Sequence, residues 1–203
     1  LLTLLDGAID DQEINRRYLK RANKSVDRMI NIIEDLETIS ALESDRVQIN
    51  YSDFDLVELV EDVFELVEDK AEKRKIKLVI NNDLDRPVTV HADRSKIEQV
   101  LINLIGNAIK YGKDDGQVEI RFFDMDKHIL TEVNDDGLGI PPEDVPRVFE
   151  RFYRVDKSRS RDAGGTGLGL SIVKHIIESH KQTINVRSSE NKGSTFSFTL
   201  KKA

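Results

Sequence analysis

The sequence predicts an α/β protein, a two-layer α+β sandwich with helices on one face of a mixed sheet, preceded by an α-helical hairpin. Three observations predict this fold class. From Tyr51 onward, segments of helical period alternate irregularly with short strand-like segments. The first fifty residues instead carry one long heptad pattern. A length of 203 residues suffices for one ordinary domain and a smaller appendage. We therefore expect two parts, residues 1–50 and 51–203.

The first fifty residues predict two helices joined by a short link. An apolar stretch at 1–5 ends at Asp6-Gly7, a typical helix stop, and a polar link follows at 9–13. Apolar residues in alternating steps of three and four then form an a/d seam, made of Leu19, Ala22, Val26, Met29, Ile33 and Leu36.

Two interpretations of this seam remain open. It is typical of one amphipathic helix lying on the domain, and also of a hairpin that pairs with a second copy into a four-helix bundle. The incomplete first helix, the short link and the long second helix favour the bundle, and hence a homodimer. Because the chain opens on Leu1 inside an apolar stretch, we expect it to be a piece of a longer protein.

The remaining elements follow from periodicity. Helices are predicted after an Asp55 cap at 56–67, at 94–111, as a short helix at 143–150, and at 168–180. Strands are predicted at 76–80, 87–91, 117–123, 129–133, 183–188 and 194–200. Residues 155–165 are charged, end in glycines and have few apolar side chains, which indicates a mobile loop.

Charge and residue usage restrict the function classes. A net charge of -7 and a pI near 5.2 argue against general nucleic-acid binding, which requires a basic surface. The absence of cysteine excludes disulfides and thiolate metal sites and fits a reducing cytoplasm. The sequence has no apolar run of about 18 residues and no secretory leader. A membrane anchor is therefore expected only in an upstream segment.

One face of the predicted helix at 94–111 is polar without a packing reason. Asn103, Asn107, Lys110 and Tyr111 share that face, whereas the other face consists of Leu, Ile and Val. Amide oxygens are hard ligands that suit Mg²⁺, and a lysine at the end of the row can meet a phosphate. An ordinary solvated helix face is the alternative.

A glycine-containing turn follows the strand at 129–133 and reads Asn134-Asp135-Asp136-Gly137-Leu138-Gly139-Ile140-Pro141. Its glycines would let backbone approach a flat ring. Asp135 would accept a hydrogen bond from an exocyclic amine. Because a carboxylate accepts but does not donate, it would select adenine over guanine. A turn without a ligand is the alternative.

A second glycine-rich stretch opens the helix at 168–180 and reads Gly164-Gly165-Thr166-Gly167-Leu168-Gly169. Exposed backbone N–H groups at a helix N-terminus favour a phosphate, although the spacing is neither that of a Walker loop nor that of a Rossmann loop. Five cations precede it, and they form either a solvated charge run or a lid over the ligand: Arg151, Arg154, Lys157, Arg159 and Arg161.

In this order the stretches resemble the ATPase-kinase superfamily that gyrase, heat-shock chaperones and histidine kinases share. Residues 103–110 are similar to its N box, 135–139 to its G1 box and 164–169 to its G2 box. Residues 149–154, Phe-Glu-Arg-Phe-Tyr-Arg, resemble the F box of bacterial sensor histidine kinases in particular. The resemblance covers 51–200, and the preceding hairpin resembles the second half of that family's dimerisation domain.

The resemblance implies a Bergerat-type ATP-binding fold with ATP and Mg²⁺ as cofactors. It makes Asn107 the Mg²⁺ ligand with Asn103 beside it, places Lys110 and Tyr111 at the phosphates, and places Arg154 in the lid at the γ-phosphate. It also implies a nucleotide site around the following residues: Asp135 at the adenine amine with Thr195 supporting it through water, Gly137, Gly139, Ile140, Gly164, Gly165, Thr166, Gly167, Leu168 and Gly169.

The resemblance also implies transfer of the γ-phosphate to a histidine and thence to an aspartate of a response regulator receiver domain. None of His91, His128, His175 and His180 has the expected context of a following acidic residue and proline. We therefore expect the acceptor histidine upstream of Leu1, in the cytoplasmic part of an inner-membrane sensor. This chain alone is then unable to autophosphorylate.

Two rival functions remain. A stand-alone ATPase would need an acidic base on the helix at 94–111, where Glu98 is more than one turn from Asn103. A nucleotide-sensing module would bind ATP without turnover, and the presence of Asn107, Lys110 and Arg154 weighs against it.

Overall fold

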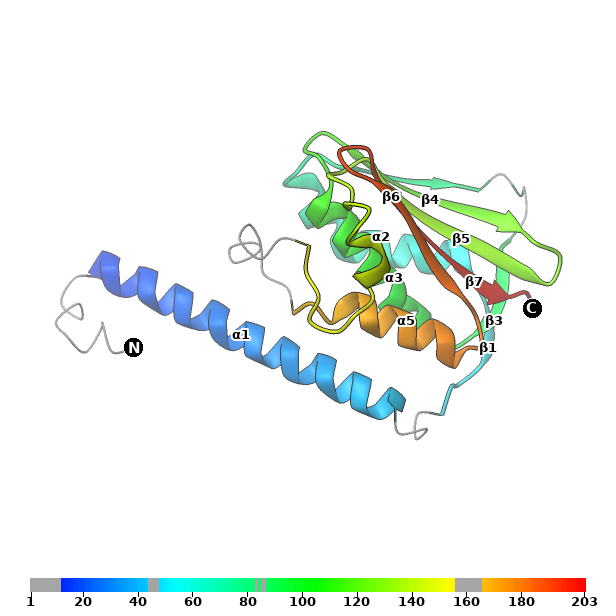
Figure 1. The fold of residues 1–203 in the computed structure, drawn as a ribbon, viewed down its shortest axis with the longest axis horizontal. Coiled ribbons are helices and arrows are strands. Elements are labelled where there is room, and N and C mark those ends of the chain that lie inside the picture. Colours follow the sequence, from blue (N-terminus) through cyan, green and yellow to red (C-terminus); the bar gives the residue numbers. More distant parts are fainter. Residues whose placement is uncertain (1–11, 44–47, 83, 85–86, 156–165) are drawn as a thin grey trace.

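The computed structural model describes residues 12–43, 48–82, 84, 87–155 and 166–203. A long helix runs beside a body of sheet and helices (Figure 1). In chain order the elements are α1 (Gln12–Glu43), β1 (Ser52–Asp55), α2 (Leu56–Glu72), β2 (Lys77–Asn81), β3 (Thr89–Ala92), α3 (Arg94–Tyr111), β4 (Gln117–Asp124), β5 (His128–Asp135), the 3-10 turn η2 (Val145–Arg147), α5 (Gly169–Ser179), β6 (Ile184–Ser189) and β7 (Gly193–Lys201).

The main sheet has five strands in the order β2-β4-β5-β7-β6. Because β2 is parallel to β4 while the other three pairings are antiparallel, the sheet is mixed. Helices α2, α3 and α5 cover one of its faces (Figure 1). The predicted two-layer sandwich is therefore confirmed.

Strands β5 and β7 show how the sheet divides into a covered face and an open face. On β7, Phe196, Phe198 and Leu200 are buried, and the residues between them are only half-buried. Since side chains alternate along a strand, the first set lies on the helix side. The register pairs these three with Val133, Thr131 and Ile129 of β5. The same pairing continues to Asp135 and Ser194, which therefore also face the helices.

Helices α2 and α3 both begin at an aspartate cap. Asp55 Oδ1 accepts the Val57 N–H at 2.8 Å, and Asp93 Oδ1 accepts the Lys96 N–H at 3.2 Å. The bounds of α3 are those predicted. Its buried stripe consists of Ile97, Val100, Leu101, Leu104, Ile105, Ala108 and Ile109. This stripe packs into the core, and it fixes where the polar face of α3 lies.

Two local features differ from the prediction. Of the expected helix at 143–150, only Val145–Arg147 is helical, as the 3-10 turn η2. In a helix that began at 143, Pro146 would be the fourth residue, where its missing N–H and its ring disrupt an α-helix. Strand β1, which was not expected, pairs antiparallel with β3 in a separate two-stranded sheet. Its first two residues are exposed, so no apolar alternation marks it in the sequence.

Helix α1 contains the whole predicted seam in one helix of 32 residues. It begins at Gln12, so the predicted link at 9–13 is wrong at its last two positions, while residues 1–5 lie outside the described residues. The helix runs beside α5 (Figure 1). Its exposed apolar side chains are Leu19, Val26, Met29, Ile30, Ile33 and Leu36. The seam is therefore not buried against the domain.

None of the helices in the described part of the chain has the length and apolar content needed to cross a bilayer.

A buried hydrogen-bond cluster joins the segment after α1 to two helix ends. Asp93, the cap of α3, accepts the Asn50 N–H on Oδ2 at 3.0 Å. The Asp93 N–H donates to His180 Nε2 at 3.1 Å, just beyond the last residue of α5. His180 Nδ1 lies 2.7 Å from the Ile176 carbonyl oxygen, to which it donates. Because Nε2 accepts, the buried ring of His180 is neutral.

We expect His180 to make the free energy of unfolding depend on pH. Burial lowers the pKa of His180 below 6.5, and this outweighs the hydrogen bond to Ile176 and the nearby Asp93 charge, which raise it. The unfolded chain therefore binds the proton first, and stability is lost as pH falls from about 6.5 through the pKa of the folded state. Urea unfolding at several pH values should show this acid slope in the parent and in His128→Gln. It should be shallower in His180→Gln, and an equal slope in that variant would contradict the assignment.

Candidate functional site

The polar face of α3 lies against the start of α5. Asn103, Asn107 and Lys110 are half-buried, and Tyr111 is 44% exposed. A Cβ on Gly169, the first residue of α5, would lie 2.5 Å from Asn103 Oδ1. The Lys110 ammonium lies 5.0 Å from the centre of the Tyr111 ring. Asn103 therefore lies beside the N-terminus of α5, and Asn107, Lys110 and Tyr111 follow it along the same face of α3.

Asp135 is the last residue of β5 and faces the helix layer. Its Oδ1 accepts the Gly137 N–H at 2.9 Å. Burial raises the pKa of Asp135, and backbone N–H groups of Gly137 and Ser194 offset part of that rise. A half-buried carboxylate at this position can accept a further hydrogen bond, and its role towards a ligand stays a prediction.

The turn after Asp135 is tied to the end of α3. The Leu138 N–H donates to the Tyr111 carbonyl at 3.1 Å. A Cβ on Gly137 would lie 2.4 Å from that same carbonyl oxygen, so only glycine allows this approach. Gly139 has a φ of +68°, and the Ile140 N–H donates to Ser188 Oγ at 2.8 Å. The turn after Asp135 and the C-terminal end of α3 are therefore held as one unit.

Thr195 does not lie where the sequence interpretation put it. It pairs with Asn134 in the sheet register, and its Oγ1 donates to Asn134 Oδ1 at 2.7 Å, on the open face. Asp135 points to the opposite face, so Thr195 is badly placed to support it. The neighbour of Asp135 on the helix side is Ser194, which is 7% exposed. Strand alternation, with Phe196 buried two positions on, could have identified Ser194.

The stretch that opens α5 is described from Thr166 onward, so Gly164 and Gly165 lie outside the described residues. Thr166 Oγ1 accepts the Leu168 N–H at 3.1 Å, and Leu168 is fully buried. Gly167 has a φ of +76°, which favours glycine. These contacts shape the loop that leads into α5, whose first residue, Gly169, lies next to Asn103.

The segment before Thr166 places Arg154 near the loop that leads into α5. Phe152 has a φ of +60°, is 58% exposed, and donates its N–H to the Gly167 carbonyl at 2.9 Å. Phe149 packs edge-on against Phe196 of the core, with ring centres 6.3 Å apart. Arg154 follows as a half-buried residue. The predicted mobile loop lies, apart from Val155, outside the described residues, as do Lys157, Arg159 and Arg161.

The donor set suits a magnesium ion that is shared with a phosphate ligand. Within the described ranges, no group of three or more His, Cys, Asp or Glu side chains could hold a metal ion. Mg²⁺ commonly keeps several waters and takes only one or two protein oxygens together with substrate phosphates. The half-buried amide of Asn107 can supply one such oxygen, so the residues fit the ion.

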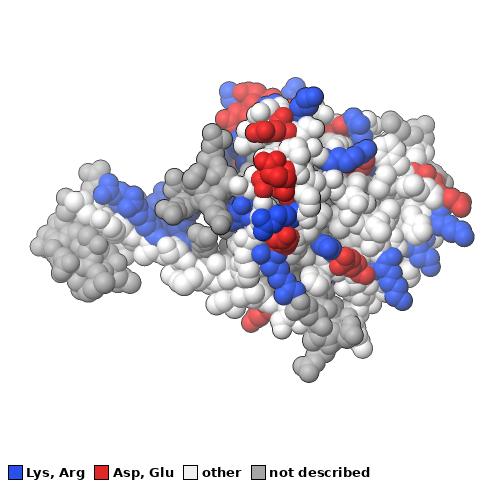
Figure 2. Space-filling model, in the orientation of Figure 1, with Lys and Arg blue, Asp and Glu red and all other residues white. Residues whose placement is uncertain are grey.

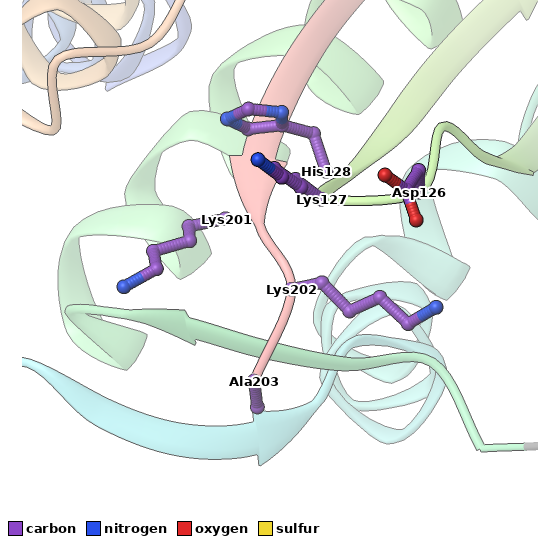
Figure 3. A pocket seen from close by; sticks show the side chains of 6 residues that line it. All are labelled: Asp126, Lys127, His128, Lys201, Lys202 and Ala203. Carbon is purple, nitrogen blue, oxygen red and sulfur yellow. The ribbon is translucent and has the colours of Figure 1, made fainter.

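A cavity of about 470 Å³ lies elsewhere (Figure 3), lined by Asp126, Lys127, His128, Lys201, Lys202 and Ala203. His128 pairs with Lys201 at one end of β5, whereas Asp135 is at the other end. In Figure 3 the lysine side chains point in different directions rather than towards a common centre. Over the surface in Figure 2, acidic and basic side chains alternate. Neither this cavity nor the surface charge offers a better candidate site than the region between Asp135 and the polar face of α3.

Comparison with known proteins agrees with this geometry. Residues 92–203 match the family described as histidine kinase-, DNA gyrase B-, and HSP90-like ATPase. The chain is 39% identical to the sensor histidine kinase WalK of Bacillus subtilis, over 98% of this chain and 33% of WalK. It is 37% identical to the histidine-protein kinase ArlS of Staphylococcus haemolyticus, over 97% of this chain and 42% of ArlS. The chain thus spans well under half of these relatives.

Solved structures give the same result for the fold. The catalytic domain of the histidine kinase ThkA superposes with a TM-score of 0.66 at 36% identity, over 75% of this chain and 96% of that domain. The histidine kinase AdeS of Acinetobacter baumannii superposes with a TM-score of 0.77 at 30% identity, over 98% of this chain and 92% of AdeS. ThkA in complex with the response regulator protein TrrA superposes with a TM-score of 0.78 at 27% identity, over 100% of this chain and 55% of ThkA.

The matched family model covers Asp135, the polar face of α3 and the start of α5. The chain therefore belongs to the histidine kinase-, DNA gyrase B- and HSP90-like ATPase family, within which it is a catalytic domain of the sensor histidine kinase type.

Proposed function

We propose that this chain binds Mg·ATP and transfers its γ-phosphate to a histidine on a separate helix, from which the phosphate passes to a response regulator aspartate. The observation that carries the proposal is the arrangement of Asp135 and the end of α3 around one site. The Leu138–Tyr111 hydrogen bond joins an acceptor for a base to a row of phosphate-binding groups. Membership of the histidine kinase type supports the direction of transfer.

In the proposed mechanism each part of the site has one role. Asp135 accepts a hydrogen bond from the adenine 6-amino group and rejects guanine, whose 6-oxo group cannot donate. Asn107 would supply an oxygen to Mg²⁺, and the bound ion would neutralise phosphate charge. Lys110 and the N–H groups at the start of α5 hold the phosphate chain, and Arg154 meets the γ-phosphate. Positioning and charge neutralisation then account for most of the rate.

The histidines of this chain are poor acceptors. His180 is 5% exposed, and both of its ring nitrogens are engaged. His91 stacks on Tyr51 and pairs with Asp53 at 2.6 Å. His128 lies at the end of β5 remote from Asp135. An in-line attack needs the nucleophile close to the γ-phosphorus. We therefore propose that the acceptor is on another segment and that this chain alone does not label itself.

His175, on α5, is also engaged, because its Nε2 lies 3.3 Å from Arg151 Nη2. His175 is therefore a poor acceptor like the other three histidines, and the proposal that the acceptor lies on another segment is unchanged.

Two partners follow from the proposal. The exposed seam of α1 supports a homodimer in which a second copy covers Val26, Met29 and Ile33. A response regulator is supported by the ThkA–TrrA complex, to whose kinase the whole of this chain is similar. An upstream membrane anchor and the division into residues 1–50 and 51–203 stay predictions.

Labelled ATP tests the proposed function. The chain is incubated with γ-labelled ATP and Mg²⁺, alone and with a separately made acceptor helix that carries a histidine followed by an acidic residue and a proline. We expect base-stable, acid-labile label on the acceptor helix and none on the chain. Release of phosphate without a labelled helix would indicate a stand-alone ATPase. Binding without label or hydrolysis would indicate a sensing module, and a labelled chain would overturn the assignment of the acceptor.

A further inference from the structure

Arg74, in the turn after α2, closes the C-terminal end of α3. Its Nη1 donates to the Ile109 carbonyl at 2.5 Å and to the Lys110 carbonyl at 2.8 Å. Its Nη2 donates to the Gly112 carbonyl at 2.9 Å. Its Nε donates to Asp114 Oδ1 at 2.8 Å. The one guanidinium group thus contacts three backbone carbonyls of another element, 35 to 38 residues further along the chain.

These contacts complete the hydrogen bonding of the helix end. A helix leaves its last four carbonyls without intrahelical partners. Here the Ala108 carbonyl accepts the Gly112 N–H at 2.8 Å, and the Tyr111 carbonyl accepts the Leu138 N–H at 3.1 Å. Arg74 supplies donors to the three carbonyls that remain between and after them. Every carbonyl from residue 108 to residue 112 therefore has a specific donor.

The same end of α3 carries the phosphate-binding groups and adjoins the adenine acceptor. The carbonyls that Arg74 holds flank Tyr111, whose own carbonyl receives the Leu138 N–H. Gly137 lies against Tyr111 and Gly112 at distances that would exclude a Cβ. Since Gly137 and Leu138 belong to the turn that follows Asp135, a shift of the Tyr111 carbonyl moves the turn that holds Asp135.

We propose that Arg74 is a positioning residue for nucleotide binding, which sets the junction between the end of α3 and the turn after Asp135. The inference rests on the proposed function of that site. Lysine cannot replace arginine here, because one ammonium cannot span three carbonyls with the geometry of a planar fork. The side chain of Arg74 is 32% exposed, so its charge also faces the negative end of the helix dipole in a partly dry setting.

The test compares Arg74→Lys with the matched control Arg94→Lys in the full chain. Arg94 lies at the other end of α3 and pairs with Asp62 at 2.5 Å, so the control removes an arginine ion pair from the same helix. Two quantities are measured well below the unfolding temperature: the affinity for Mg·ADP by calorimetry, and the hydrogen exchange of single backbone amides without nucleotide. The exchange readout does not depend on the proposed function.

We expect Arg74→Lys to weaken Mg·ADP binding about tenfold, the scale of one charge-assisted hydrogen bond. The Leu138 amide should exchange faster, whereas the Ile97 amide at the start of α3 should not change. Arg94→Lys should alter neither affinity nor Leu138 exchange. If Arg74→Lys lowers only the unfolding temperature and leaves affinity and Leu138 exchange unchanged, Arg74 is merely structural and the inference is wrong.

Failure of the proposed function gives a different pattern. A parent chain that binds no adenine nucleotide would disprove that function whatever the variants do. Faster Leu138 exchange in Arg74→Lys would then still show that the guanidinium holds the junction, but its role in nucleotide binding would be refuted. If the parent binds Mg·ADP and Arg74→Lys binds it equally well, the inference about Arg74 is refuted, whereas the proposed function is not.

Discussion

Replacing Asp135 with asparagine should reduce the affinity for Mg·ATP roughly ten- to a hundredfold. The half-buried carboxylate accepts the Gly137 N–H, and in the proposed function it accepts a second hydrogen bond from adenine. An amide of the same shape keeps one acceptor atom, but its NH₂ group turns a donor towards either Gly137 or the adenine amine. One of the two hydrogen bonds must then be lost, inside a site where an unpaired polar group is costly.

The neighbouring aspartate is a suitable control. Asp136 is exposed, and its Oδ1 accepts the Gln117 N–H at 3.2 Å. Calorimetry with ATP and GTP on the parent, Asp135→Asn and Asp136→Asn should show a loss only in Asp135→Asn, together with weaker discrimination against GTP. An Asp135→Asn variant that binds ATP as tightly as the parent would show that the base is held elsewhere.

Acidification should act on the same group. Because burial raises the pKa of Asp135 above 3.8, the carboxylate takes up its proton at a higher pH than an exposed aspartate does. The protonated acid is a poorer acceptor. The affinity of the parent for Mg·ATP should therefore decrease as the pH is lowered, and calorimetry should show a smaller decrease in Asp135→Asn.

The sequence was most informative where the signal is local. Helix α3 was predicted with its observed bounds, because the apolar stripe that becomes its buried face lies within the helix itself. The strand that ends at Asp135 and the turn after it were predicted for a similar reason, since the strand, the turn and its glycines are consecutive. Periodicity and turn chemistry report on neighbours in the chain, and these elements need nothing else.

The features that were missed depend on distant partners. Arg74 contacts Ile109 and Gly112 across more than thirty residues, and no spacing rule links them. Strand β1 exists because β3 lies beside it, not because of its own four residues. The position of Thr195 is an error of a different kind, because the alternation of β7 was readable and shows that Ser194 shares the face of Asp135.

The second large effect is expected for Gly193→Ala, which should reduce the free energy of unfolding by about 2–5 kcal/mol. Gly193 begins β7 with a φ of +105°, a conformation that alanine adopts only with strain. An added Cβ would lie 1.9 Å from the Asp135 carbonyl oxygen and 2.9 Å from the Asp136 Cα, both of them backbone atoms. The start of β7 and the end of β5 must then move apart, and this displaces Asp135.

The matched control is Gly106→Ala, in the interior of α3, where an added Cβ would meet nothing within 4 Å. Because glycine is a poor helix former, this change should instead stabilise the chain by about 0.5–1 kcal/mol. Urea unfolding measures both changes, and calorimetry with Mg·ADP should show weaker binding only in Gly193→Ala. If the two variants are equally stable, the start of β7 can move away from β5 without a loss in the free energy of unfolding. The close approach of Gly193 to Asp135 would then not hold this end of the sheet together.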